Sequence, residues 1–210
     1  MIKKYKNKGY FISFEGGEGT GKSTQAKILY DYLITKNIAT ILTREPGGCK
    51  EAEEIRNLII NGSVDKWDGI TEALMHNAAR REHIRRIIKP ALLNNKFVIC
   101  DRFTDSTMAY QGIGQSVNTK FLNNIVKTVT ENIEPNLTFI FDMDIKNSLL
   151  RANKIDANRY EKFDNSFHEK IRNYFLNIAQ NNNRYVIIDA DKSIENVKKE
   201  ILKIITKVII

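Results

Sequence analysis

The chain has 210 residues, a length that suits one domain with a full core and leaves no room for a second independent domain. Apolar residues make up 42% and charged residues 28%, which excludes an intrinsically disordered chain, and no apolar run approaches the roughly 18 residues of a membrane span. The net charge of +8 comes from scattered lysines, which favours a solvated surface over a nucleic-acid partner, and two cysteines without a metal-ligand pattern fit a reducing cytoplasm.

Short apolar runs alternate along the chain with longer segments of helical periodicity, which is typical of βαβ units around a parallel sheet. We expect strands at residues 10–15, 38–43, 96–101, 137–142 and 184–189. Helical patterns occur at 22–36, 50–61, 70–94, 118–133, 145–155, 164–182 and 193–208. The strands are apolar almost throughout, so we expect helices on both faces of the sheet and ligands at the carboxyl ends of the strands. Pro90 is expected to bend or interrupt the helix over 70–94.

The turn after the first strand has the form of a phosphate-binding loop. Residues 16–23 read Gly-Gly-Glu-Gly-Thr-Gly-Lys-Ser, which fits G-x-x-x-x-G-K-S with a strand before it and a helix after it. Glycines let successive N–H groups face phosphate oxygens, and Lys22 is expected to reach the β and γ phosphates. The predicted ATP-binding residues are Gly16, Gly17, Glu18, Gly19, Thr20, Gly21, Lys22, Ser23 and Thr24. A turn that only joins strand to helix is the alternative, and the loop alone does not separate a kinase from a GTPase or an ATPase.

A carboxylate follows the third strand, in the run Cys100-Asp101-Arg102-Phe103. An aspartate beside a phosphate-binding loop usually holds the Mg²⁺ shell, directly or through water, and the loop serine supplies a hydroxyl ligand. Ser23 and Asp101 are therefore the predicted metal-binding residues, with Mg²⁺ as the cofactor that accompanies ATP. Capping of the following helix is the simpler alternative for Asp101.

Further motifs follow the phosphate-binding loop in a fixed order. They are Thr-Arg-Glu-Pro-Gly-Gly at 43–48, Ala-Ala-Arg-Arg-Glu-His at 78–83, and Asp101-Arg102-Phe103 with Ser106, Tyr110, Gln111 and Gly112. Together with Glu18 in the loop, they resemble the thymidylate kinase family over nearly the whole chain. The resemblance implies an α/β class, three-layer P-loop nucleoside monophosphate kinase fold, with a five-stranded parallel sheet flanked by helices. It also implies one domain over 1–210 with a short lid near 151–163, a homodimer, and phosphorylation of dTMP to dTDP by Mg-ATP for dTTP biosynthesis.

The resemblance assigns the acceptor site. It implies that Arg102 contacts the acceptor phosphate with Arg44 and Arg56 nearby, while Glu18 and Glu45 accept hydrogen bonds from sugar hydroxyls or metal-bound water. The implied acceptor-binding residues are Glu18, Arg44, Glu45, Pro46, Arg56, His76, Arg80, Arg102, Phe103, Ser106, Thr107, Tyr110 and Gln111. Arg80, Thr107 and Gln111 would read the base, and Tyr110 would pack on the sugar and disfavour a 2′-hydroxyl. Exposed salt bridges are the alternative for the arginines.

The chemistry agrees with this assignment, because a nucleoside monophosphate is already an oxyanion at neutral pH and needs no general base. Mg-ATP and a monophosphate bring roughly four negative charges together, so the site needs cations, and guanidinium groups can grip phosphate with two hydrogen bonds.

His76 departs from the family pattern, which usually has Phe or Tyr stacking on thymine at this position. Imidazole has a reference pKa of about 6.5, so we expect any stacking on His76 to depend on pH between about 5.5 and 7.5. An ordinary, satisfied helix residue is the alternative.

The lid segment is the expected source of a further catalytic cation, because the phosphate-binding loop has no Arg or Lys between its outer glycines. Arg159 is the first choice and Arg151 the second, so the predicted catalytic residues are Lys22, Arg102, Arg159 and Arg151. A solvated, charged helix end is the alternative for this segment.

Two other functions remain open from the sequence. A deoxynucleoside kinase would need a carboxylate base for its neutral hydroxyl acceptor, and it would gain nothing from arginines at the acceptor mouth. A nucleotide-binding ATPase that is not a kinase would share the phosphate-binding loop.

Overall fold

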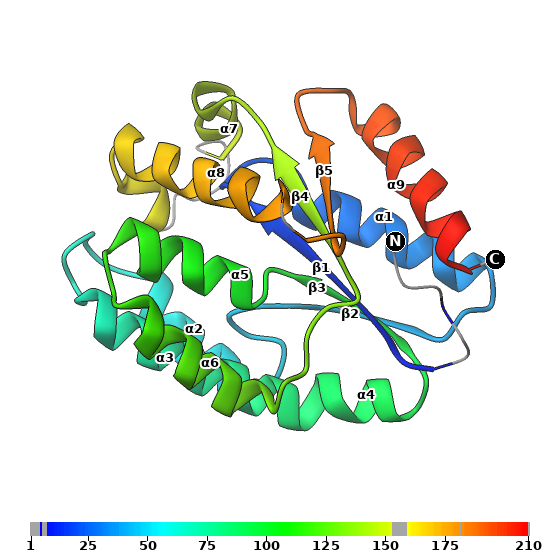
Figure 1. Cartoon of the computed structure of the whole chain (residues 1–210), viewed down its shortest axis with the longest axis horizontal. Coiled ribbons are helices and arrows are strands. Elements are labelled where there is room, and N and C mark those ends of the chain that lie inside the picture. The colour runs from blue at the N-terminus through cyan, green and yellow to red at the C-terminus, as the bar shows by residue number, and fades with distance from the viewer. Residues whose placement is uncertain (1–4, 6–7, 153–158, 181, 210) are drawn as a thin grey trace.

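The computed structural model describes residues 5, 8–152, 159–180 and 182–209, and within these ranges five parallel strands form one sheet (Figure 1). The strands lie in the order β2-β3-β1-β4-β5. They are β1 (Tyr10–Gly16), β2 (Thr40–Arg44), β3 (Phe97–Asp101), β4 (Leu137–Asp142) and β5 (Tyr185–Asp189). Every predicted strand is confirmed, although β2 begins at Thr40 rather than at residue 38.

Helices cover both faces of the sheet, as the apolar strands predicted (Figure 1). On one face, α1 (Lys22–Thr35) and α9 (Ile194–Ile209) pack against alternate β1 residues such as Ile12 and Phe14. On the other face, Phe11 packs under the turn η1 (Ile84–Ile88) and the helix α4 (Lys89–Leu93), and Ile140 packs under α8 (Asn165–Gln180). The three-layer α/β fold is therefore present.

The remaining helical segments lie on the second face and beyond the carboxyl ends of the strands. They are α2 (Lys50–Ile60), α3 (Gly69–His83), α5 (Thr104–Thr107), η2 (Met108–Gly114), α6 (Thr119–Thr130), α7 (Ile145–Ala152) and η3 (Arg159–Lys162). The helix predicted over 70–94 is one helical run in which η1 is a π-turn just before Pro90, because a proline lacks the N–H for the α-helical bond. The part of the predicted 145–155 helix after Ala152 lies outside the described residues.

Segment 104–114 is helical, although the sequence predicted no helix there. Its Thr, Ser and Gly residues have weak intrinsic helix propensity. Tertiary contacts with α8 and β1 hold it in place, and Ala109 is fully buried. This correction matters because the segment carries several of the predicted acceptor residues.

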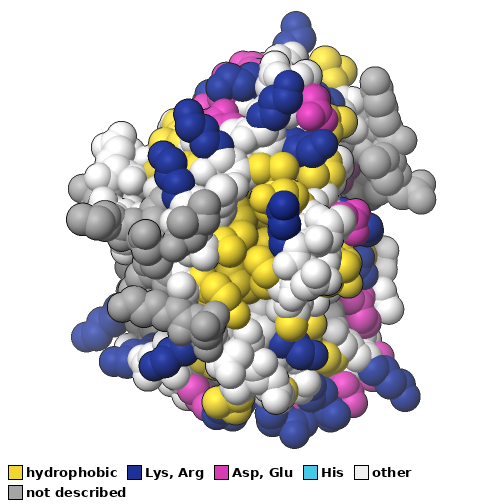
Figure 2. Space-filling view, turned by 90° about the vertical axis from the view of Figure 1, so that its right-hand side faces the viewer, with side chains coloured by type: hydrophobic (Ala, Val, Ile, Leu, Met, Phe, Trp, Pro, Cys, Tyr) yellow, Lys and Arg dark blue, Asp and Glu magenta, His cyan; other side chains and the backbone are white. Residues whose placement is uncertain are grey.

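On one face of the molecule the positive charge is dispersed. Figure 2 shows the right-hand side of Figure 1, where Lys and Arg side chains are spread among acidic ones around a central hydrophobic area. Among the described residues, no helix is both long and apolar enough to cross a membrane.

Candidate active site

The phosphate-binding loop joins the carboxyl end of β1 to the N-terminus of α1. Gly19 has a φ of 67°, and a Cβ at this position would lie 2.0 Å from the Ser148 carbonyl oxygen of α7. Only glycine therefore allows α7 to pack directly on the loop. Lys22, the first residue of α1, is buried and donates hydrogen bonds to the Gly17 carbonyl and, over 3.2 Å, to Thr20 Oγ1.

The surroundings of Lys22 lower the pKa of its ammonium group. Burial and the nearby Arg102 guanidinium lower the pKa of Lys22 to about 8, and the carboxylates of Glu18, Asp101 and Glu15 limit the shift. A phosphate group beside the ammonium would act in the same direction as these carboxylates and raise that pKa.

The two predicted metal ligands lie together. The Ser23 hydroxyl donates a hydrogen bond to Asp101 Oδ2, because β1 and β3 pair in a register that sets Phe14 beside Asp101. Thr24 is exposed one residue further along α1. Among the described residues no three His, Cys, Asp or Glu side chains gather as a metal site. One carboxylate and one hydroxyl, completed by phosphate oxygens and water, is the oxygen set that suits Mg²⁺.

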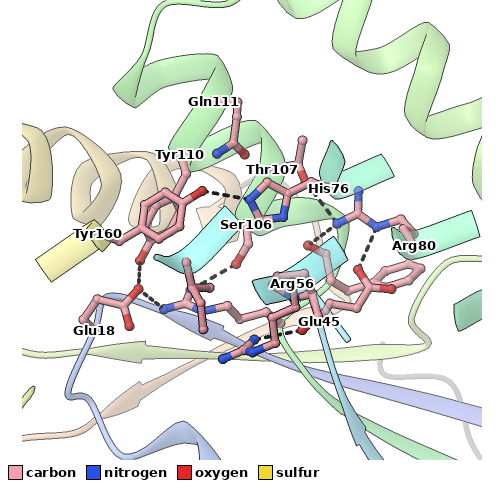
Figure 3. Close-up of a pocket in the computed structure, with 14 residues that line it drawn as sticks. Glu18, Glu45, Arg56, His76, Arg80, Ser106, Thr107, Tyr110, Gln111 and Tyr160 are labelled. Atoms are coloured by element: carbon pink, nitrogen blue, oxygen red, sulfur yellow. Dashed lines mark hydrogen bonds and ion pairs between the residues drawn. The ribbon is translucent and has the colours of Figure 1, made fainter. Parts of the chain in front are cut away.

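A pocket opens beside the loop, at the carboxyl ends of β1, β2 and β3 (Figure 3). Apart from Arg44, the predicted acceptor residues all line it, and Ile60 and Tyr160 line it as well. Arg44 is instead exposed and donates to Glu53 Oε2 of α2 over 3.0 Å, while Glu53 also accepts from the Gly48 N–H over 2.9 Å. The structure thus brings together residues from the loop, the turn after β2, the helices α2 and α3, the segment 102–111 and η3.

Arg102 connects this pocket to the phosphate-binding loop. Its Nη1 donates to the Gly16 carbonyl over 2.9 Å and to Ser106 Oγ over 3.1 Å, and its Nη2 donates to Glu18 Oε1 over 2.7 Å. Glu18 also accepts from the Tyr110 hydroxyl over 3.0 Å. Burial opposes the charge of Glu18, but Arg102, Lys22 and the Tyr110 hydroxyl outweigh it and hold the Glu18 pKa below its usual value.

Arg80 is the fixed cation at the far end of the pocket (Figure 3). Its Nε donates to Glu45 Oε2 over 2.7 Å, its Nη1 to Asn77 Oδ1 over 3.1 Å, and its Nη2 to Thr107 Oγ1 and the Phe103 carbonyl over 3.0 and 3.2 Å. One of the two Nη1 hydrogens has no partner among the described residues. A guanidinium clamped in this way presents one N–H in a fixed direction.

Glu45 is the carboxylate that forms the ion pair with Arg80. Burial raises the pKa of this carboxyl, but Arg80 and His83 outweigh burial and leave the pKa lowered overall. His83 Nδ1 lies 3.1 Å from Glu45 Oε1, and its Nε2 lies 2.6 Å from Thr43 Oγ1. A Cβ at Gly48 would lie 2.4 Å from that Nε2, so this glycine of the 43–48 motif makes room for His83.

His76 lines the pocket, but the expected pH dependence is wrong. Its Nε2 lies 2.9 Å from the Tyr160 hydroxyl oxygen, and the ring is partly buried. Burial, followed by the charges of Arg80, Arg159, Arg102 and Arg56, lowers the pKa of His76 to about 3. The ring is therefore neutral between pH 5.5 and 7.5, because a charge on a buried imidazole is unfavourable and the four nearby arginines add to that cost.

Arg159 does not lie where the lid hypothesis put it, and this is the main correction to the predicted site. Its side chain is fully buried and forms an ion pair with Glu72 of α3, and its Nη1 donates a further hydrogen bond of 3.3 Å to the Val64 carbonyl. It therefore supports the wall of this pocket. Residues 153–158 of the predicted lid lie outside the described residues. Arg151 is exposed on α7, the helix that packs on the phosphate-binding loop, and donates to the Ala190 carbonyl over 3.1 Å.

Two important residues were missed by sequence reasoning. Glu72 is fully buried and accepts hydrogen bonds from Arg159, from the Tyr160 hydroxyl over 2.8 Å and from Gln111 Nε2 over 3.1 Å. It lies four residues before His76, and Arg80 lies four residues after His76, so helical spacing could have placed Glu72 on the pocket face of α3. Tyr160 carries no comparable signal in the sequence.

The chain is similar to known proteins of one family. The family model described as thymidylate kinase matches residues 14–201. A thymidylate kinase of Caulobacter vibrioides is 43% identical over 95% of this chain and 97% of its own length, and one of Finegoldia magna is 41% identical over 94% and 98%. The crystal structure of thymidylate kinase from Ehrlichia chaffeensis has a TM-score of 0.76 at 36% identity, over 94% of this chain and 99% of that one. The chain belongs to the thymidylate kinase family.

Proposed function

We propose that this protein transfers the γ-phosphoryl group of Mg-ATP to the phosphate of dTMP, giving dTDP for dTTP biosynthesis. As a member of the thymidylate kinase family, the enzyme is an ATP:dTMP phosphotransferase. The observation that carries the proposal is Arg102, which lines the acceptor pocket and at the same time hydrogen-bonds two residues of the phosphate-binding loop, Gly16 and Glu18. One guanidinium therefore lies between the donor and acceptor sites.

Charge neutralisation is the main task of this site. The acceptor phosphate is already an oxyanion, so the transfer requires no general base and depends on positioning and on cations. Lys22 supplies positive charge from the donor side and Arg102 from the acceptor side. Arg56 donates to the Pro46 carbonyl over 2.8 Å on the pocket wall, which leaves its remaining N–H groups for the acceptor phosphate.

The far end of the pocket is suited to a pyrimidine. We assign the remaining Arg80 N–H as the hydrogen-bond donor to a carbonyl of the base, and Gln111 as the partner of the neighbouring edge of the base. The neutral His76 ring would stack on the face of the base. Tyr110 is held by Glu18 and has its ring 5.0 Å from the Arg102 guanidinium, where it would meet the sugar.

The Mg²⁺ ion would be held by Ser23 and Asp101. When bound, it would supply positive charge to the phosphate oxygens of ATP. The Ser23 hydroxyl donates to Asp101, which keeps the two ligand atoms close together.

Arg151 is our candidate for the lid cation, in place of Arg159. It belongs to α7, whose backbone closes on Gly19 of the loop, and its exposed side chain can move from the Ala190 carbonyl. Arg159 would have to abandon Glu72 to take this role, and breaking a buried ion pair costs roughly 3–5 kcal/mol.

A deoxynucleoside kinase fits the pocket less well. Its hydroxyl acceptor needs a carboxylate base, and the two pocket carboxylates, Glu18 and Glu45, are engaged by Arg102 and Arg80 with lowered pKa values.

The test is a coupled assay of ADP formation with dTMP, dUMP, other nucleoside monophosphates and thymidine. We expect turnover with dTMP and none with thymidine, and preferential turnover of thymidine would replace the proposal.

We also propose that the enzyme is a homodimer. Leu58 of α2, Ile70 and Leu74 of α3 and Phe121 of α6 are large apolar side chains with exposed fractions of 37% to 54%. Their helices contact one another, α3 lying against both α2 and α6. Light scattering on the purified enzyme should give twice the monomer mass, and a monomer at micromolar concentration would exclude this part of the proposal.

A further inference from the structure

Glu15 is a buried carboxylate to which the scheme above gives no role. It lies in β1 immediately before the phosphate-binding loop, and its side chain has no exposed surface. Its Oε1 accepts a hydrogen bond from the Phe103 N–H over 2.8 Å, and its Oε2 accepts one from the Ser106 hydroxyl over 2.6 Å. Glu15 therefore hydrogen-bonds both ends of residues 103–106, the short segment that follows Arg102.

Ser106 separates Glu15 from the acceptor pocket. Ser106 lines the pocket (Figure 3), and its hydroxyl oxygen accepts a hydrogen bond from Arg102 Nη1 over 3.1 Å. A hydroxyl has a single hydrogen to donate. While Glu15 is ionised, that hydrogen is directed at Glu15 and cannot be donated to a ligand. If Glu15 carries a proton on Oε2, its O–H donates to Ser106 Oγ and the serine hydrogen turns into the pocket.

We propose that Glu15 is a positioning residue whose protonation turns the Ser106 hydroxyl toward the acceptor phosphate, so that the enzyme takes up a proton when the nucleoside monophosphate binds. The inference rests on the proposed assignment of the pocket as the acceptor site. A phosphate oxygen needs donors and is repelled by a nearby carboxylate, so both effects of the proton favour the bound state. The proton comes from solvent and returns to it when the ligand leaves.

The surroundings of Glu15 keep its two protonation states close in free energy. Burial and, to a smaller extent, the nearby Asp105 carboxylate raise the pKa of Glu15 to about 7. The Ser106 hydroxyl, Arg102 and the Phe103 N–H lower this pKa but do not outweigh them. Asp105 is itself paired with Arg184 over 2.7 Å and with the Tyr185 hydroxyl over 3.1 Å. The titratable and charged groups that face Glu15 are Lys22 of α1, Cys100 of β3, Arg102, Asp105 of α5 and Tyr174 of α8.

The sign of the effect follows from this pKa. The protonated form, which frees the serine hydrogen, predominates below about pH 7 and is lost as the pH rises. If only that form binds tightly, apparent affinity follows its population and falls by about eightfold between pH 6.5 and pH 8.0. The phosphate of dTMP titrates in the same range. Thymidine 5′-sulfate is therefore the better probe, because a sulfate ester remains a monoanion throughout.

The experiment is calorimetry with thymidine 5′-sulfate at pH 7.5 in buffers of different ionisation enthalpy, which counts the protons bound. Wild-type enzyme should take up more protons than Glu15→Gln, whose amide always donates to Ser106. Any proton uptake by Lys22 is common to the wild type and Ser106→Ala, which keep Glu15, whereas Glu15→Gln also removes a carboxylate that raises the Lys22 pKa. Affinity for Glu15→Gln should be independent of pH from 6.5 to 8.0, at the wild-type value for low pH.

Ser106→Ala is the matched control, because it leaves Glu15 in place but removes the hydroxyl that transmits its state. Its affinity at low pH should be weaker than that of the wild type and should change less with pH, because only the direct repulsion between the Glu15 carboxylate and the sulfate remains. This variant decides the matter if Glu15→Gln does not fold. Equal proton uptake by the wild type and either variant overturns the role of Glu15. Failure of Arg80→Ala to weaken the binding of thymidine 5′-sulfate would instead overturn the acceptor-site assignment.

Discussion

The buried pair of Glu72 and Arg159 gives the sharpest test of the structure, because both side chains are essentially inaccessible to solvent. Glu72→Ala removes the only carboxylate that the structure sets against Arg159 among the described residues. It also takes an acceptor away from the Tyr160 hydroxyl and from Gln111. We expect this substitution to be far more damaging than its position, remote from the phosphate-binding loop, would suggest.

The expected loss of stability follows from removing one ion of a buried pair and leaving the other without its partner. Leaving a buried charge without its partner costs about 3–5 kcal/mol, which for a protein of this size lowers the melting temperature by roughly 6–20 °C. Arg159→Met should cost less, because Glu72 retains hydrogen bonds from the Tyr160 hydroxyl and Gln111. The double variant Glu72→Met with Arg159→Met should recover much of the loss, since apolar replacement of both ions is often neutral.

Urea unfolding of the wild type, the two single variants and the double variant measures these differences as a cycle. The KM for dTMP should rise in Glu72→Ala, because Tyr160 and Gln111 line the acceptor pocket. If Glu72→Ala stays within about 1 kcal/mol of the wild type, a small effect for a buried charge, the pair is not formed in solution. If Arg159→Met keeps full stability but loses kcat, Arg159 serves as the lid cation after all.

Four further outcomes test the site. Lys22→Ala should abolish phosphoryl transfer without unfolding the protein, and activity within about tenfold of wild type, roughly 1.4 kcal/mol of barrier, would remove the lysine from the mechanism. Arg102→Ala should lower turnover with dTMP far more than it weakens ATP binding, and an equal loss in both would move the residue to the donor site. Arg151→Ala should lower kcat with little change in dTMP affinity, whereas unchanged kcat would exclude it as the lid cation. The His76 ring proton signals should not shift in NMR spectra between pH 5.5 and 7.5, because its pKa is lowered to about 3, and a midpoint near 6.5 would contradict the burial described for this ring.

Much of the fold and of the site could be predicted from the sequence, because the necessary signals are local. The five strands are short apolar runs, and the phosphate-binding loop is one continuous motif between a strand and a helix. Several acceptor residues, such as Glu45, Arg102 and Phe103, directly follow the carboxyl ends of β2 and β3, which parallel pairing brings to the same edge of the sheet as the loop. Ser23 and Asp101 meet for the same reason, although 78 residues separate them.

Other features were decided only by tertiary contacts. The helical form of 104–114 goes against its weak intrinsic propensity and depends on packing against α8. Arg159 is drawn to Glu72, which lies 87 residues earlier, and this partner turns a predicted lid cation into a buried support of the pocket. His76 has an ordinary imidazole in the sequence, but burial and four converging arginines lower its pKa in the folded chain. Motifs and strand ends are fixed by neighbouring residues, whereas the ionisation and orientation of a side chain depend on charges that only folding brings near it.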